Sequence, residues 1–335
     1  MLYKLFTVYT KWLIVIRNNI FSMDDVMKKI RIGTRGSRLA LAQARQVQEA
    51  LQSAYPDHEI ELVAIKTTGD KIMDAPLPKI GDKGLFTKEI EKELIAGTID
   101  LAVHSLKDMP TELPAGLMIG AVTRRLDPRD VFISKQGKSL GSLRHGDTVA
   151  TGSLRRKAQL MAFNPGLTVI DIRGNVETRL TKMKSDPRIQ GIILAGAGIE
   201  RLGMTEAVTE IVPEEIIIPA VGQAALAVEI REHDPLTQEL VAVLDHWESR
   251  IAVSCERVFL SKLGGGCQVP IAGLARLSDD KLTLTGLVAS LDGGEIYRGS
   301  LSDGITNFSE LGKNLAQKLL DAGAGKILDK IYENI

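Results

Sequence analysis

The sequence predicts an α/β protein of three domains, with two α/β lobes followed by a small α+β domain. A chain of 335 residues is longer than one hydrophobic core usually serves. Strands and helices alternate from about residue 28, and the alternation restarts after the charged, proline-containing segment 124–130. After Trp247 the pattern changes to a long helix, a glycine run and alternating strands, which is typical of an α+β domain.

The composition narrows the classes of function. Hydrophobic residues make up 44% of the chain and charged residues 25%, as in globular proteins in solution. The formal net charge is zero and aromatic residues are 4%, so neither a global field nor stacking platforms favour nucleic acid, and nothing favours a membrane surface. Two cysteines, Cys255 and Cys267, form no disulfide framework and fit a reducing compartment.

Residues 1–27 precede the first convincing strand, and we expect a disordered leader or a start assigned too far upstream. Their apolar run, residues 12–16, is too short to span a bilayer, and no small-residue cleavage site follows it. A targeting peptide is the less favoured alternative.

The first lobe is assigned to residues 28–123 together with 220–243. After a strand over 29–33, Ser37 is placed to cap a helix. One apolar stripe follows at helical spacing: Ala40, Ala44, Val47, Leu51 and Ala54. The further elements are a strand over 60–66, a loop over 67–84, a helix over 87–96 and strands over 99–103, 117–122 and 224–230. This order predicts a mainly parallel sheet covered by helices.

The second lobe is assigned to residues 129–218, and the third domain to 247–335. In the second lobe we expect strands over 148–151, 167–171 and 192–195, and helices with Leu154, Ala158 and Met161 on one face and Val176, Leu180 and Met183 on another. A further strand is expected over 216–218, which leads with 224–230 back to the sheet of the first lobe. In the third domain we expect a helix to Leu263, a strand over 281–285 and a helix from about residue 307.

Polar groups crowd at the end of the strand in the stretch IDLAVHSLKDMP, residues 99–110. In open α/β sheets, ligands bind outside the carboxyl ends of the strands. Asp108 beside Lys107 is therefore a candidate catalytic carboxylate, while the alternative is a solvated ion pair on a surface turn. On this stretch alone the alternative is favoured.

Several strand ends in both lobes present hydroxyl groups or arginines. Thr151 and Ser153 precede a helix whose free N–H groups favour anions, while Arg155 and Arg156 lie in its first turn, where the helix dipole disfavours cations. The same position after other strands is taken by Arg35, Ser37, Arg173 and, further along, Arg179 and Arg201. Each alone reads as a surface residue, but the recurrence predicts a polyanionic ligand between two lobes.

Three other patterns in the sequence give weaker evidence of function. Residues 196–198 read Gly-Ala-Gly after a strand, but Arg201 stands where a dinucleotide fingerprint needs glycine. The five histidines show no metal-ligand spacing, so no metal is expected. Cys255 is expected in a core, whereas Cys267 follows three glycines and is either an incidental surface thiol or a point of covalent attachment.

Six motifs in order resemble the hydroxymethylbilane synthase family, also called porphobilinogen deaminase, from about Ile30 to the end. They are GTRGSRLALAQ (33–43), KGLFTKE (83–89), DLAVHSLKDMP (100–110), TGSLRRKAQL (151–160), RGNVETRL (173–180) and LGGGCQVPIAG (263–273). The resemblance implies two lobes like those of periplasmic binding proteins, with the active cleft between them, and a monomer in the cytoplasm.

The same resemblance implies the reaction. Four porphobilinogens condense head to tail with loss of four ammonia on a dipyrromethane cofactor, which a thioether joins to Cys267, and water releases the linear tetrapyrrole. Asp108 is the implied catalytic carboxylate, stabilising the cation that forms when ammonia leaves. A two-lobe anion-binding protein without catalysis is the alternative, which would explain the arginines but neither Cys267 nor Asp108.

The family pattern also assigns contacts to residues of this chain. The implied cofactor contacts are Cys267, Lys83, Ser105, Lys107, Asp108, Thr151, Ser153, Arg155, Arg156, Arg173 and Gly174. The implied substrate contacts are Arg35, Ser37, Arg173, Arg179 and Arg201, and Lys79 is expected to line the loop.

Overall fold

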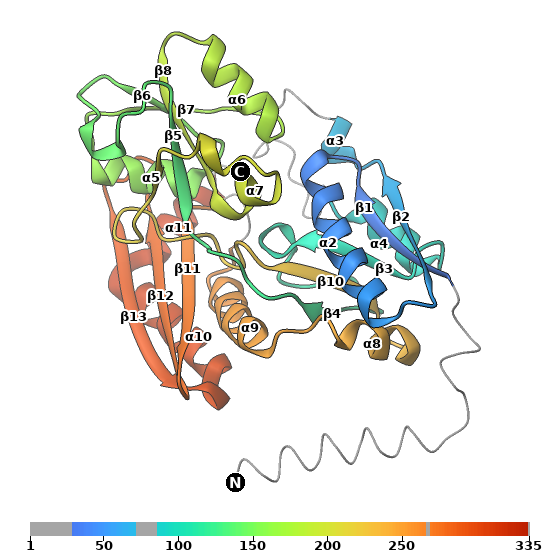
Figure 1. The fold of residues 1–335 in the computed structure, drawn as a ribbon. Helices are drawn as coiled ribbons and strands as arrows, with labels where there is room; N and C mark the ends of the chain where they lie inside the picture. The colour runs from blue at the N-terminus through green and yellow to red at the C-terminus, as the bar shows by residue number, and fades with distance from the viewer. Residues whose placement is uncertain (1–28, 72–85, 266–268, 334–335) are drawn as a thin grey trace.

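The structure is a computed structural model that describes residues 29–71, 86–265 and 269–333. The predicted leader 1–27 and residues 72–84 of the predicted loop lie outside these ranges. Within the described ranges, no helix combines the length and the apolar character that crossing a bilayer requires. The described elements form two five-stranded sheets and one three-stranded sheet, so the predicted fold class is confirmed (Figure 1).

The first sheet has the strand order β2-β1-β3-β10-β4. Its strands are β1 (Lys29–Arg35), β2 (Glu59–Ile65), β3 (Leu101–Ser105), β4 (Leu117–Val122) and β10 (Leu226–Arg231). Strands β1, β2 and β3 run parallel, while β10 inserts antiparallel between β3 and β4. The helices are α2 (Arg38–Ala54), α3 (Thr68–Lys71), α4 (Lys88–Ile95) and α8 (Pro235–Ala242). We call this sheet with its helices lobe 1.

Helix α2 begins where the sequence predicts. The Ser37 hydroxyl accepts a hydrogen bond from the Ala40 N–H, so Ser37 is the N-cap. The predicted stripe from Ala40 to Leu51 is buried, but Ala54, at the last position of the helix, is exposed. The stripe therefore ends one turn earlier than the periodicity indicates.

The second sheet has the order β7-β6-β8-β5-β9, and with its helices it forms lobe 2. Its strands are β5 (Asp130–Ser134), β6 (Thr148–Ala150), β7 (Thr168–Ile170), β8 (Ile189–Ala195) and β9 (Glu210–Ile211), and its helices are α5 (Leu154–Phe163), α6 (Val176–Ser185) and α7 (Gly196–Arg201). The sequence did not predict β5, whose short apolar run directly follows charged residues. The predicted strand over 216–218 is wrong, because these residues form a turn and an irregular connection.

The buried face of α5 also differs from the prediction. Leu154 and Met161 are only partly buried, whereas Arg155 and Arg156 are almost completely buried. The helix thus turns its charged side inward, against its apolar periodicity, and the interior of lobe 2 must supply counter-charge.

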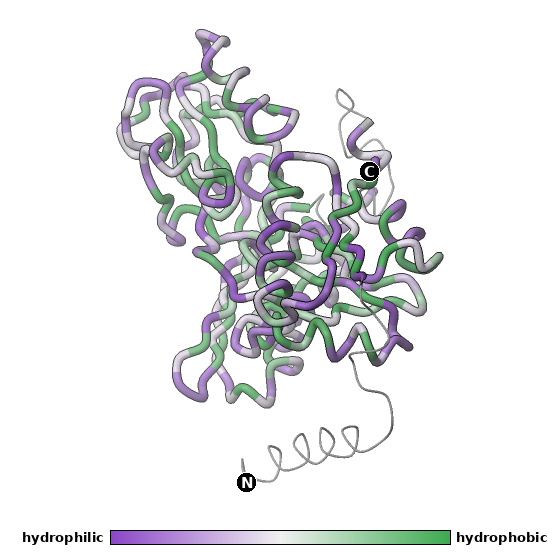
Figure 2. The backbone as a smooth tube through the Cα atoms, turned by 45° about the vertical axis from the view of Figure 1, so that its right-hand side comes forward, coloured by the Kyte–Doolittle hydropathy of each residue, from purple (hydrophilic) through white to green (hydrophobic). Residues whose placement is uncertain are grey.

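The third sheet, with order β11-β12-β13, is antiparallel. Its elements are α9 (Trp247–Lys262), β11 (Ile271–Ser278), β12 (Lys281–Ala289), β13 (Ile296–Gly304), α10 (Phe308–Leu319) and α11 (Gly325–Tyr332). Phe259 of α9 and Leu315 of α10 are fully buried in a core against β11 and β12. Hydrophobic stretches alternate with hydrophilic ones along the elements of all three parts (Figure 2). The domain boundaries predicted from the sequence stay a prediction, which this division into sheets supports.

Two segments cross between the lobes, one after β4 and one before β10, and α9 lies beside both. The fully buried Glu256 carboxylate accepts hydrogen bonds from Arg125 Nη1 at 2.5 Å, Gly222 N at 2.7 Å and Ala275 N at 2.8 Å. These donors belong to the first crossing segment, the second crossing segment and β11. One carboxylate therefore joins both crossings to the third sheet.

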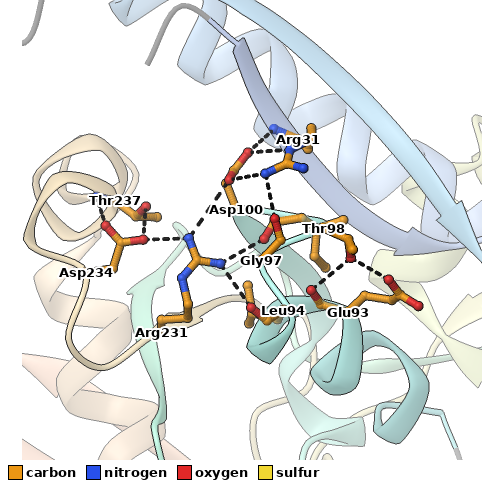
Figure 3. Close-up of polar contacts among 10 residues, drawn as sticks. Arg31, Glu93, Leu94, Gly97, Thr98, Asp100, Arg231, Asp234 and Thr237 are labelled. Carbon is orange, nitrogen blue, oxygen red and sulfur yellow. Dashed lines mark hydrogen bonds and ion pairs between the residues drawn. The ribbon is translucent and has the colours of Figure 1, made fainter. Parts of the chain in front are cut away.

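A second buried carboxylate, that of Asp100, joins neighbouring strands of lobe 1 (Figure 3). It lies at the start of β3, whereas Asp108 follows the end of this strand. Asp100, just before β3, accepts hydrogen bonds from the backbone N–H of Arg31 at 2.8 Å and from its Nε at 3.1 Å and Nη2 at 2.9 Å. Arg231, at the end of β10, lies 3.9 Å from the same carboxylate and also pairs with Asp234 at 2.6 Å. This network ties β1, β3 and β10 together.

We expect Asp100→Asn to lower the free energy of unfolding by about 1–3 kcal/mol, because the amide cannot accept all of the hydrogen bonds that the buried carboxylate accepts. Urea unfolding followed by circular dichroism measures the change. Glu310→Gln, which removes an exposed ion pair on α10, is the control and should leave the midpoint unchanged. Equal stability of both variants would contradict this account of the network.

Candidate functional site

The centre of the predicted site is the turn that follows β3. Residues Leu106–Asp108 form a single 3-10 turn, in which Asp108 is exposed and Lys107 is half-buried. Ser105, the last residue of β3, accepts a hydrogen bond from Gln43 Nε2 of α2 at 2.8 Å. The turn thus presents a carboxylate and an ammonium group outside the carboxyl end of β3, as the sequence predicts.

Lys107 lies among charges from both lobes. The pKa of its ammonium group is lowered to about 8, chiefly by burial and also by the nearby guanidinium groups of Arg156 and Arg155, while Asp108 and Asp130 oppose the shift. The Lys107 ammonium group lies 3.5 Å from Gln223 Oε1. The Nε2 of the same Gln223 amide donates a hydrogen bond to Asp130 Oδ1 at 2.8 Å. Gln223 therefore links the Lys107 turn of lobe 1 to β5 of lobe 2.

Arg155 and Arg156 share one buried counter-ion. Arg156 Nη2 lies 2.8 Å from Asp130 Oδ1, and Arg155 Nη2 lies 2.9 Å from Asp130 Oδ2. Asp130 is completely buried, and the two guanidinium groups hold the pKa of its carboxyl well below the usual range, against the effect of burial. Among the described residues, the buried Nε of Arg156 has no hydrogen-bond acceptor. Arg155 and Arg156, both predicted ligand contacts, are thus buried inside lobe 2, and the Nε of Arg156 is a donor still available to a ligand.

The segment before α5 supplies the predicted hydroxyl groups. Thr151 is buried, and its Oγ1 accepts a hydrogen bond from Ser153 N at 3.4 Å. Ser153 caps α5 by accepting from Arg156 N at 3.5 Å. A Cβ at Gly152 would lie 2.9 Å from the Ile172 carbonyl oxygen, so only glycine fits this turn without movement.

A cluster of cations follows β7. Arg179 of α6 donates from Nε to Gly174 O at 2.7 Å, and Gly174 has a φ of 116°, which favours glycine. Burial lowers the pKa of Arg179 to about 10; the charges of Arg156 and Arg173 contribute, while Asp171 and Asp108 oppose the shift. Asp108 therefore lies within electrostatic range of one cation in each lobe, Lys107 and Arg179.

The remaining predicted contacts are Arg35 and Ser37 of lobe 1 and Arg201 of lobe 2. Arg35 pairs with Asp70 of α3 through Nε at 3.2 Å and through Nη2, and its guanidinium stacks 4.1 Å from the centre of the Phe86 ring. Arg201 donates to Ala224 O at 2.8 Å and to Gln46 Oε1 of α2 at 3.4 Å. Both arginines therefore already have protein partners, which orient them and occupy part of their donor capacity.

Three predicted residues, Lys79, Lys83 and Cys267, lie outside the described residues. Sequence reasoning missed the partners of the polar and charged site residues, among them Gln43 of Ser105, Asp70 of Arg35, Asp130 of Arg155 and Arg156, and Gln223 of Lys107. Asp130 carried a usable signal, because an aspartate directly before an apolar run is placed to enter a strand and meet the paired arginines 155 and 156. In the part of the chain that is described, no group of three or more His, Cys, Asp or Glu side chains could hold a metal ion.

We expect Asp130→Asn to lower the free energy of unfolding by about 3–5 kcal/mol, because two buried guanidinium groups lose their shared counter-ion. Urea unfolding measures the loss. Asp186→Asn, which breaks an exposed ion pair with Arg188 in the same lobe, is the matched control and should leave the midpoint unchanged. A loss below about 1 kcal/mol at residue 130 would contradict this role.

Among solved structures, the similarity is weak. The methionine binding protein MetQ is 14% identical, with a TM-score of 0.43, over 69% of this chain and 95% of that chain.

Sequence comparisons are decisive. A family model described as "Porphobilinogen deaminase, dipyromethane cofactor binding domain" matches residues 30–239, and one described as "Porphobilinogen deaminase, C-terminal domain" matches residues 250–321. The porphobilinogen deaminase of Syntrophomonas wolfei is 52% identical over 302 residues, covering 90% of this chain and 98% of that protein. That of Moorella thermoacetica is 51% identical over 305 residues, covering 91% and 97%. The chain belongs to the porphobilinogen deaminase family.

Proposed function

We propose that this chain is a hydroxymethylbilane synthase, which condenses four porphobilinogens into a linear tetrapyrrole with loss of four ammonia. The observation that carries the proposal is the position of Asp108. This exposed carboxylate lies on the turn after β3, within electrostatic reach of Lys107 in its own lobe and Arg179 in the other. Such a site can bind an anionic substrate and still offer one negative group to a cation formed during reaction.

The residues present fit a dipyrromethane, which carries carboxylates on its pyrrole rings. Lys107, Arg173 and Arg179 supply positive charge, and the buried Arg156 Nε supplies a donor for which the described residues offer no acceptor. When bound, this group supplies a fixed pyrrole to which substrate is joined. We propose that Cys267 holds it covalently and that the following residues hold its carboxylates and N–H groups: Lys83, Ser105, Lys107, Asp108, Thr151, Ser153, Arg155, Arg156, Arg173 and Gly174.

We propose Asp108 as the catalytic carboxylate. Loss of ammonia from an aminomethylpyrrole leaves a cation delocalised over the ring, and a carboxylate at the pyrrole N–H stabilises it as it forms. Asp108 is exposed, and no described backbone or side-chain hydrogen bond to its carboxylate ties it elsewhere, so it is accessible to a substrate N–H. Arg35, Ser37, Arg173, Arg179 and Arg201 are proposed to bind substrate carboxylates.

A two-lobe anion-binding protein without catalysis would use the same arginines. It gives no reason for an exposed carboxylate inside a cluster of cations, where Asp108 would repel an anionic ligand. We further propose a monomer located in the cytoplasm and binding neither nucleic acid nor membrane. The zero net charge and the free, buried Cys255 support this proposal.

Intact-mass spectrometry of the purified protein tests the function. The enzyme should carry an adduct with the mass of two linked pyrroles, and Cys267→Ser should lack it. Asp108→Asn should keep the adduct while losing most of the turnover, since an amide cannot stabilise the forming cation. An unmodified wild-type protein that binds porphobilinogen without turning it over would favour the anion-binding alternative.

The pH dependence of kcat/KM tests the role of Lys107. Because the pKa of Lys107 is lowered to about 8, its positive charge is present below pH 8 and is lost above it. We expect kcat/KM to fall as the pH rises through about 8, as carboxylate binding weakens. Lys107→Arg should move this fall to higher pH, because a guanidinium keeps its charge. An unchanged profile in that variant would assign the titration to another group.

A further inference from the structure

We propose that Arg257 of α9 is a positioning residue for Asp108, holding the backbone of the turn that carries this carboxylate. The inference deepens the proposed function and rests on it, because it takes Asp108 as the group that acts on substrate. Arg257 belongs to the helix of the third domain, and the sequence motifs do not include it.

The contacts of Arg257 are directed at the chain just after Asp108. Its Nη2 donates to the carbonyl oxygen of Pro110 at 2.6 Å and to that of Thr111 at 3.2 Å. Hydrogen bonds from a charged donor are stronger than those between neutral groups. The Arg257 guanidinium therefore fixes two consecutive peptide units. Burial lowers the pKa of Arg257, so the guanidinium has left bulk water to make these contacts.

The turn has few backbone hydrogen bonds of its own. Leu106 N donates to Ala225 O at 3.1 Å, and Met109 N donates to Leu106 O at 3.1 Å. Pro110 has no N–H to donate. The beginning of the turn is therefore held by the segment before β10, and its end is held by Arg257.

Apolar packing comes from the same face of α9. Leu106 and Met109 are buried in one cluster with Val253, and Val253 and Arg257 are four residues apart, so they lie on one side of the helix. Asp108, between the two buried side chains, is exposed. Two anchors on α9 thus fix the backbone on either side of the carboxylate and leave its side chain exposed.

The chain offers a matched control on the same helix. Arg250 also reaches from α9 to lobe 1, donating from Nη2 to Gly120 O at 2.7 Å, and it pairs with Asp245 at 2.8 Å. It makes the same kind of contact with β4 instead of with the Asp108 turn. A general role in joining α9 to lobe 1 would give both arginines similar effects, whereas positioning Asp108 concerns Arg257 alone.

The experiment compares steady-state kinetics of Arg257→Gln, Arg257→Lys and Arg250→Gln, all checked for the cofactor adduct by intact mass. We expect Arg257→Gln to lower kcat about ten- to a hundredfold, with KM within about twofold, because a displaced catalytic group costs rate more than binding. Arg257→Lys, which keeps one charged donor, should recover part of the loss. Arg250→Gln should keep kcat while lowering the unfolding midpoint.

A double-mutant cycle separates positioning from a structural role. If Arg257 acts through Asp108, Arg257→Gln should leave the residual kcat of Asp108→Asn unchanged. Additive losses in the double variant, or equal losses of kcat in Arg257→Gln and Arg250→Gln, would overturn the inference. Near-normal kcat in both Arg257 variants beside a severe loss in Asp108→Asn would overturn it and leave the proposed function intact. If Arg257→Gln does not fold, the kcat of Arg257→Lys, alone and with Asp108→Asn, decides by the same comparisons.

Discussion

The Glu256 carboxylate is the interaction on which the arrangement of the molecule depends. It is fully buried, and its oxygens accept hydrogen bonds from both crossing segments and from β11. A buried charge is costly unless its partners satisfy it completely, and here a guanidinium and two backbone N–H groups do so. Arg125, which is paired with Glu256, also donates a hydrogen bond to Gln223 O and so helps to fix the position of Gln223. The relative position of the lobes at Lys107 and Asp130 follows from this junction.

Charge in the site is organised in two layers. Arg155 and Arg156 lie inside lobe 2, partly neutralised by Asp130, and they act on the site mainly as a fixed positive background. Lys107, Arg173 and Arg179 are more accessible and carry the charge that meets a ligand. Fixing the inner layer within the fold means that little reorganisation is needed when an anion binds, which favours both affinity and orientation.

Local patterns in the sequence predict the elements that local physics determines. The Ser37 and Ser153 caps, the apolar stripe of α2 and the polar end of β3 follow from hydrogen-bonding capacity and periodicity alone. What escaped prediction depends on partners distant in sequence. Strand β5 is short and begins with a charge that the distant Arg155, Arg156 and Gln223 stabilise, and Arg35 pairs with Asp70, which is 35 positions away. Motif resemblance could name site residues but not these partners.

The placement of β10 has a consequence for how the chain reaches its native state. This strand fills the gap between β3 and β4, yet it follows the whole of lobe 2 in the sequence. During synthesis, lobe 2 is built from one uninterrupted stretch, 130–211, and can collapse as soon as it leaves the ribosome. Lobe 1 begins first in the sequence, but its sheet is incomplete between β3 and β4 until β10 has been synthesised. Lobe 1 therefore completes its sheet after lobe 2, and a chain truncated before residue 226 leaves the edges of β3 and β4 exposed to unwanted pairing.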